Sequence, residues 1–153
     1  MFRMLPALLL CAASSALAGG GHVLTVSAAV LSKNNCRFAA ATATLSLSID
    51  PAGGTAVASG ATLSIRCTGS AATANWSLTS NSGLYGSSPS ALRMRHGSDT
   101  AQFLPYSLTF PSSGSVAKNV WQDLTVTATV LPADFQNALP GAYSDTVVLS
   151  LLP

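Results

Sequence analysis

The chain has 153 residues, of which 48% are hydrophobic and only 8% are charged, and its formal net charge is +2 at pH 7. This length predicts one domain, and so weak a charge without a basic run argues against a nucleic-acid partner. All five acidic residues are aspartates, whereas Thr, Ser, Val, Leu and Ala are abundant, a composition that favours strands over helices.

The first residues have the pattern of an export signal. Arg3 gives a basic start, residues 5–13 are apolar, and residues 16–18 (ALA) have the small-x-small form of a signal-peptidase site. The apolar stretch is too short to anchor the chain in a bilayer. We therefore expect cleavage after Ala18 and an exported mature chain with no stable membrane span.

A period-two segment follows the glycines at 19–21. In residues 22–31 (HVLTVSAAVL), apolar residues occupy alternate positions, and Thr25 and Ser27 lie between them. This period predicts an amphipathic strand with one buried face. The apolar positions of that face are Leu24, Val26, Ala28 and Val30. Taken by itself, the pattern fits an ordinary first strand of a sheet.

The rest of the chain predicts a series of short strands. We expect Trp76 and Trp121 to face the core, with partial exposure of Trp121 left open because it stands next to Gln122 and Asp123. Turn-rich segments such as DPAGG, PSSGS and PADFQNALPG separate the strands, and no stretch has a helical period. The expected strands cover residues 36–49, 55–67, 74–80, 91–96, 101–110, 120–131 and 142–152. Such regular punctuation predicts an all-β sandwich or barrel, with a strand count close to the immunoglobulin type.

The final predicted strand has nothing after it to cover its free side. It starts near Tyr143, and its core-facing positions are Val147, Leu149 and Leu151. A sandwich open beside this strand would expose unpaired backbone groups and an apolar groove. We expect the spare strand at 22–31 to fill the groove, either in its own chain or in a neighbouring copy.

Two cysteines, Cys36 and Cys67, lie beyond the predicted signal. An even number of cysteines in an exported chain predicts one disulfide.

The densest group of ionisable residues is RMRHGSD, which contains Arg93, Arg95, His96 and Asp99. A catalytic interpretation would make His96 a general base oriented by Asp99. However, charges commonly gather at turns between strands, and no nucleophile elbow, metal-ligand pair or phosphate loop accompanies them. We expect no catalytic residue, no metal site and no cofactor, and hence a protein that is not an enzyme.

Four segments, taken together, resemble the spore coat U (protein U) domain family, which includes the subunits of archaic chaperone–usher pili. In chain order they are VLTVSAAVLSKNNC, SGATLSIRCTGSA, LRMRHGSDTAQFLPYSLTF and PGAYSDTVVLSLLP. The resemblance extends over essentially the whole mature chain.

The resemblance implies an incomplete immunoglobulin-like β-sandwich that lacks its last strand and is completed by donor-strand exchange. It divides the chain into a signal peptide (1–18), a donor-strand extension (19–31) and a pilin domain (32–153). It further implies a Cys36–Cys67 disulfide. The implied donor strand presents Leu24, Val26, Ala28 and Val30, and the implied edge strand of the acceptor groove presents Tyr143, Val147, Leu149 and Leu151.

The same resemblance implies a function and a set of partners. The chain would pass through the periplasm to the cell surface and form a fibre that supports adhesion or biofilm formation. Its partners would be a periplasmic chaperone, an outer-membrane usher and other copies or related subunits. Two alternatives stay open: a spore or cyst coat protein of the same fold, and a self-complemented secreted module that binds a surface.

Overall fold

The computed structural model describes residues 34–153. The predicted signal peptide, its cleavage site at Ala18 and the four apolar positions at 22–31 lie outside the described residues. No helix in the described part of the chain has the length and hydropathy needed to cross a bilayer.

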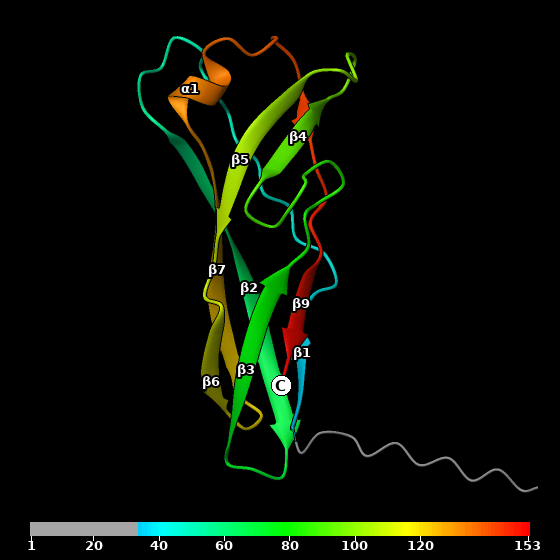
Figure 1. Ribbon diagram of the computed structural model, residues 1–153. Coiled ribbons are helices and arrows are strands. Elements are labelled where there is room, and N and C mark those ends of the chain that lie inside the picture. Colours follow the sequence, from blue (N-terminus) through cyan, green and yellow to red (C-terminus); the bar gives the residue numbers. More distant parts are fainter. Residues whose placement is uncertain (1–33) are drawn as a thin grey trace, which may run out of the picture. The chain divides into compact units, whose positions relative to one another are not determined.

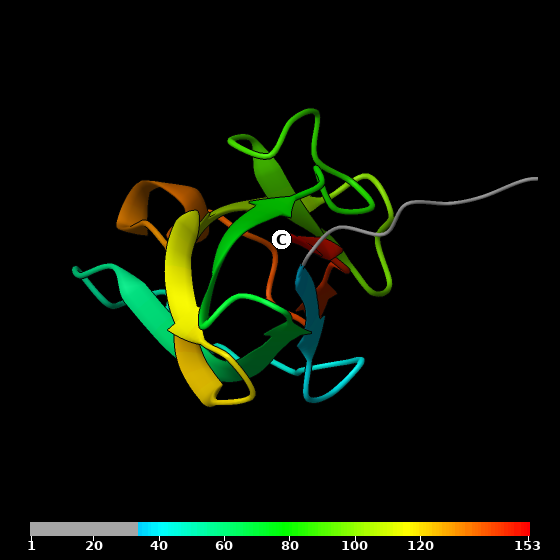
Figure 2. The ribbon, with the colours of Figure 1, turned by 90° about the horizontal axis from the view of Figure 1, so that it is seen from below.

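The predicted all-β fold is confirmed, and its two antiparallel sheets form an immunoglobulin-like sandwich (Figure 1). The strands are β1 (Asn34–Phe38), β2 (Val57–Gly69), β3 (Thr73–Ser80), β4 (Leu92–His96), β5 (Phe103–Thr109), β6 (Ser113–Ala117), β7 (Trp121–Val130), β8 (Tyr143–Ser144) and β9 (Leu149–Leu152), and one short helix is α1 (Pro132–Phe135). The larger sheet has the order β1-β2-β7-β5-β4-β8, and the smaller has the order β6-β3-β9. Viewed along the strands, the sheets face one another around a shared interior (Figure 2).

The core follows from alternation along the strands, because successive side chains of a strand point to opposite faces. One cluster joins buried residues of β2, β3, β6 and β7, and its members are Ile65, Cys67, Ala74, Trp76, Leu78, Val116 and Leu124. A second cluster forms where α1 covers β5 and β7, and its buried members are Leu104, Val130 and Phe135. Trp76 is therefore a core residue, as its position predicted.

Cys36 and Cys67 lie directly opposite each other in the β1–β2 ladder, and a disulfide joins them. Cys67 is fully buried in the first cluster, and Cys36 packs against that cluster from β1. The bond therefore ties an edge strand of the larger sheet to the interior of the sandwich.

Two segments that we predicted to be turns contain regular structure. PSSGS runs into β6, which pairs with β3 so that Gly114 lies opposite Trp76. A Cβ atom at Gly114 would lie only 2.6 Å from the indole Cζ2, so glycine allows the close approach of strand and ring. PADFQNALPG begins with α1, where Pro132 takes an early helical position that suits its missing N–H and Phe135 is buried. The turn prediction was wrong for both because partners distant in sequence fix these segments.

Candidate functional site: the open edge of the sandwich

One edge of the sandwich is open between two segments that are far apart in sequence, residues 34–49 and residues 143–152. β1, in the first segment, is the last strand of the larger sheet, and β9, in the second, is the last strand of the smaller sheet. The two strands lie side by side in both views without being paired (Figures 1 and 2). Within residues 34–153, no strand pairs with the outer edge of either.

The first border is the extended run predicted at 36–49, and it is paired only at its start. β1 ends at Phe38, and the Ala39 N–H still donates to the Ser64 carbonyl at 2.8 Å. Beyond that point no strand is formed, yet Leu45, Leu47 and Ile49 are half-buried and the residues between them are exposed. The prediction of one continuous strand over 36–49 was therefore wrong, although Leu45, Leu47 and Ile49 alternate with exposed residues as they would in a strand. Such a segment has an apolar face and no partner on its outer side.

The second border is the final segment, which contains the four predicted groove-edge residues. All four are half-buried: Tyr143, Val147, Leu149 and Leu151. From Val147 onward the half-buried residues alternate with exposed ones, which are Val148, Ser150 and Leu152. Leu149 and Leu151 pack against the first core cluster, and Tyr143 packs against the second. Instead of one strand over 142–152, the structure has two short ones: β8 pairs with β4, and β9 pairs with β3.

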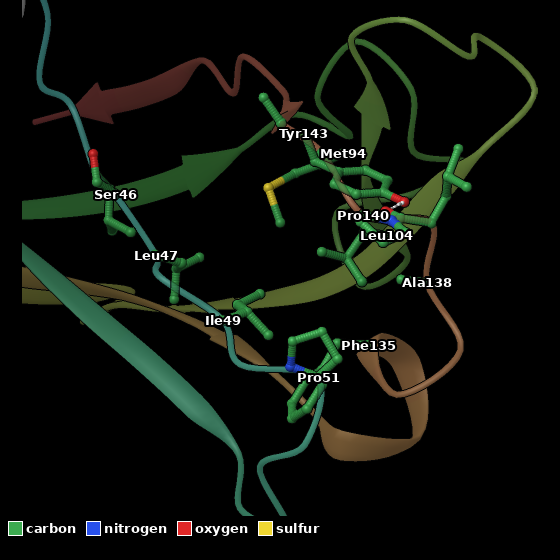
Figure 3. Close-up of a pocket in the computed structure, with 14 residues that line it drawn as sticks. Ser46, Leu47, Ile49, Pro51, Met94, Leu104, Phe135, Ala138, Pro140 and Tyr143 are labelled. Atoms are coloured by element: carbon green, nitrogen blue, oxygen red, sulfur yellow. Dashed lines mark hydrogen bonds between the residues drawn. The ribbon is translucent and has the colours of Figure 1, made fainter.

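A hollow of about 340 Å³ lies between the two borders at the end of the sandwich covered by α1. Residues 45–51 form one wall, residues 138–143 form the other, and Met94, Leu104 and Phe135 lie between them (Figure 3). This volume far exceeds the roughly 30 Å³ that one water molecule occupies in the liquid. The lining is mostly apolar, so the hollow suits aliphatic side chains.

A loop supports the final segment from the side away from the open edge. Asn81 donates its N–H to the Val148 carbonyl at 3.0 Å, and its side-chain oxygen accepts the Val148 N–H at 2.9 Å. Asp145 accepts hydrogen bonds from the Tyr106 hydroxyl at 2.7 Å and the Leu84 N–H at 2.8 Å. These contacts hold residues 145–148, which join β8 to β9 and have no strand partner of their own within residues 34–153. They leave the groove side of the segment free.

The contact with Asp145 also changes the chemistry of Tyr106. Burial, the hydrogen bond to Asp145 and the negative charge of that carboxylate together raise the pKa of Tyr106 well above its ordinary value. The phenol is therefore held in its neutral, hydrogen-bond-donating form.

His96 is a structural residue of the groove rim. It is 6% exposed, and its Nδ1 accepts the N–H groups of Ser98 and Asp99 at 3.2 and 2.9 Å. Because Nδ1 accepts, the proton of the neutral ring is on Nε2, which donates to the Pro140 carbonyl at 3.2 Å. The ring also packs edge-on against Tyr143 with centroids 4.9 Å apart. His96 thus fixes the loop that forms one wall of the hollow.

The other charged residues of RMRHGSD do not complete a catalytic arrangement with His96. The Asp99 carboxylate accepts the Ala101 N–H at 3.0 Å, and its contact with His96 is through the backbone. Arg93 stacks over Phe103 and Arg95 over Tyr85. Across residues 34–153, no three His, Cys, Asp or Glu side chains come close enough to hold a metal ion.

Sequence reasoning missed the residues that hold the final segment in place, Asn81 and Asp145. Their positions carried a signal in part, because Asn81 directly follows a predicted strand and precedes a Ser/Gly loop, where an Asn side chain commonly bonds the backbone. No pattern, however, pairs Asn81 with Val148 or Asp145 with Tyr106, since these contacts join residues 67 and 39 positions apart.

The sequence profile of the Spore Coat Protein U domain matches residues 22–150, which confirms the resemblance drawn from the four segments. None of the curated proteins matches the chain. Among solved structures, one chain from a chaperone–tip adhesin complex, described as vital for synergistic activation of CFA/I fimbriae biogenesis, matches with a TM-score of 0.47 and 13% sequence identity. The match covers 79% of this chain and 41% of that chain, so the present chain spans less than half of its length.

Proposed function

The chain belongs to the Spore Coat Protein U domain family, and on this premise we propose that it is a structural subunit of a surface fibre that polymerises by donor-strand complementation. The observation that carries the proposal is the open edge between residues 34–49 and 143–152. Both borders present apolar side chains inward, and neither has a strand on its outer side within the described chain. Beyond β1, the first border therefore has no strand partner in the described chain, and its free backbone groups meet the requirement for β-augmentation.

The occupant that we propose is residues 22–31 of a second copy. Leu24, Val26, Ala28 and Val30 repeat every second residue, as do the half-buried residues of both borders. Inserting these four side chains would bury on the order of 200–350 Å² of apolar surface, worth roughly 5–9 kcal/mol before ordering costs. Backbone hydrogen bonds to the two borders would add about 1 kcal/mol each. These terms are comparable to the whole stability of a small domain.

Chain geometry favours insertion into another copy over insertion into the same one. Ser32 and Lys33 are the only residues between the predicted donor strand and β1. A strand running parallel to β1 in the same chain would need a connection of roughly a dozen residues. An antiparallel strand would need a two-residue hairpin, and such turns favour Gly, Asn or Asp at positions with positive φ. Ser32-Lys33 is too short for the parallel connection and contains no Gly, Asn or Asp for the hairpin. The donor strand therefore acts in trans.

The proposal also explains the route to the cell surface. An apolar groove with unpaired edges would aggregate if it were left empty during export. A periplasmic chaperone would cover the groove, and an outer-membrane usher would bring the next subunit to replace it. Residues 1–18 would then serve as the signal peptide, 19–31 as the donor extension and 32–153 as the pilin domain of a fibre that supports adhesion or biofilm formation. No chemical step is required of the protein in this function.

The test places charges on one face or the other of the donor strand in the full exported chain. L24D/V26D puts two carboxylates on the apolar face, whereas T25D/S27D puts the same two on the polar face. We expect unheated denaturing gels of T25D/S27D and the unsubstituted chain to show a ladder of heat-labile multimers. L24D/V26D should migrate as a monomer, because inserting its carboxylates into the groove would bury unpaired charge.

The two variants have the same net charge, length and number of added carboxylates, so a general effect of added acid would change both equally. Equal ladders from both variants, or a monomeric unsubstituted chain, would contradict the proposal. In the second case the chain is a self-complemented module.

A further inference from the structure

The end of the sandwich at which β1 begins carries basic side chains. Arg37 and Arg66 lie opposite each other in the β1–β2 ladder, and Arg66 lies opposite Trp121 of β7. The guanidinium carbons of Arg37 and Arg66 are 5.8 and 4.8 Å from the centre of the Trp121 ring. Lys118 is exposed in the adjoining β6–β7 turn, and its N–H donates to the Ala72 carbonyl of the β2–β3 turn.

Trp121 is 43% exposed, so it is not a core residue, and the partial exposure left open for it is what the structure has. Trp121 lies on the outward-facing side of β7, as exposed Asp123 does. Arg37 and Arg66 cover part of its ring. Asp123 accepts a hydrogen bond from the Ser64 hydroxyl, and Arg66 Nε is buried with no hydrogen-bond partner. The arginines are thus held against an aromatic ring at the surface, with charge left for an external partner.

The opposite end of the sandwich carries acidic side chains. Asp134 lies in α1, Asp50 follows the border residue Ile49, and Asp99 lies in the β4–β5 turn. Pro51, next to Asp50, lines the same hollow as Phe135 of α1.

The β4–β5 turn reaches this end as well, because the Gly97 N–H donates to the Ala142 carbonyl at 2.8 Å. Figure 1 shows α1 and the β4–β5 turn at the end opposite the β6–β7 turn. Arg95 is the nearest cation in β4, but its guanidinium stacks on Tyr85, 4.4 Å from the ring centre. Within residues 34–153, the Asp50 and Asp99 carboxylates accept hydrogen bonds from the backbone N–H groups of Ala52 and Ala101, not from basic side chains.

We propose that these two ends dock on each other in the fibre. The basic end of one copy, formed by Arg37, Arg66 and Lys118, contacts the acidic end of the copy whose groove its extension fills, formed by Asp50, Asp99 and Asp134. This inference rests on the proposed function.

The short connection between the donor strand and β1 makes the docking unavoidable. Ser32 and Lys33 reach at most about 10 Å when extended, at roughly 3.3–3.6 Å per residue. The basic end of the donating copy therefore lies next to the end of the neighbour's groove at which residue 31, the last residue of the donor strand, is placed. Leaving at the acidic end joins opposite charges, whereas leaving at the basic end would press like charges together, which is strongly disfavoured.

The docking has two structural consequences. The inserted strand must run antiparallel to residues 143–152, since that segment runs from the acidic end toward the basic end. Each copy also offers one end of each sign, so the contact is heterologous and repeats along an open fibre. Complementary ends of this kind mainly increase the rate of association, by about 10–1,000-fold at low ionic strength.

The test follows the growth of multimers after the full exported chain, with its disulfide intact, is diluted from denaturant. Growth is compared at about 0.01 M salt, where charges act over about 30 Å, and at about 1 M, where they act over about 3 Å. The variant R37E/K118E reverses the basic end, and K118E alone is a milder change in an exposed turn. R93E is the matched control, because it reverses an outer-face arginine of β4 away from the basic end.

We expect the unsubstituted chain and R93E to grow about tenfold or more faster at low salt than at high salt. R37E/K118E should lose this acceleration and grow no faster at low salt than at high salt, because its altered end now repels the acidic end. K118E should lie between. Adding D134K copies to R37E/K118E copies should recover part of the lost rate.

A synthetic 22–31 peptide separates this inference from the proposed function, because it fills the groove without bringing a second end. It should bind R37E/K118E and the unsubstituted chain equally. If the peptide binds but all variants grow at one salt-independent rate, the docking is overturned and donor-strand insertion stands. If the peptide does not bind at all, the proposed function fails first.

Discussion

Removing the Cys36–Cys67 disulfide should lower the free energy of unfolding by about 3–4 kcal/mol. The perturbation is C36A/C67A, in which alanine avoids placing a hydroxyl in the apolar site of fully buried Cys67. The magnitude follows from the loop that the bond closes, since the two cysteines are 31 residues apart and a cross-link stabilises by restricting the unfolded chain. The bond also matters to the groove, because it fixes β1 at one border.

The assay is urea unfolding, followed by tryptophan fluorescence, of the 32–153 chain, which lacks the predicted donor strand and should be monomeric. Trp76 is 3% exposed in the folded protein, so its emission reports unfolding of the core. With a urea slope of about 1–3 kcal/mol/M, the midpoint should fall by roughly 1–4 M. Chemically reduced wild-type protein is the control, because it loses the cross-link and keeps both sulfur atoms in place.

Loss of less than about 1 kcal/mol in both C36A/C67A and the reduced protein would refute the reasoning, given that a loop of this length is expected to contribute several times more. A loss confined to C36A/C67A would show instead that packing of the buried sulfur, and not the cross-link, stabilises the first core cluster.

Two further predictions concern the support of the final segment. Because the pKa of Tyr106 is raised in the folded state, its contribution to stability is complete below about pH 10 and is lost as the pH rises toward the folded value. Y106F should therefore leave the phenolate absorbance of the folded protein near pH 11 unchanged, since Tyr106 is still neutral there; a clear decrease would contradict the assignment. Gly83 has a φ of +69°, and a Cβ there would collide with the Asp145 carboxylate. G83A should lower the free energy of unfolding, measured by urea titration, by about 2–3 kcal/mol. G54A should be neutral, because a Cβ at Gly54 meets nothing within 4 Å, and equal stability of the two variants would rule out the proposed strain.

The sequence predicts strands well where a segment has one face in the core and a regular partner. β2, β3 and β7 follow the expected spans 55–67, 74–80 and 120–131 closely, because their inward residues alternate against the first core cluster. β6 was missed since only Val116 among its residues is buried, and a Ser/Gly run carries no period. Its strand conformation depends on pairing with β3.

The groove was predictable only in part. The sequence predicted the final segment as one border of the groove, whereas residues 36–49 were expected only as a strand. No local signal showed that pairing stops at Phe38 or breaks between β8 and β9. Those interruptions come from contacts such as Asn81 with Val148. Trp121 was expected to face the core, although its place in the alternation with Asp123 and Thr125 along the strand indicated the outer face. For Trp121, the position in the alternation of β7 determined whether the side chain is buried, and the size of the side chain did not.

The central claim is that residues 22–31 of one copy fill the groove of another, and mass photometry of two chains tests it most directly. Exported chains covering 19–153 and 32–153 are compared with and without excess 22–31 peptide. We predict multimers from the 19–153 chain that the peptide suppresses, and monomers from the 32–153 chain that bind one peptide each. A stable 19–153 monomer, with the 32–153 chain merely less stable, would show that the strand closes its own sandwich and would contradict the account.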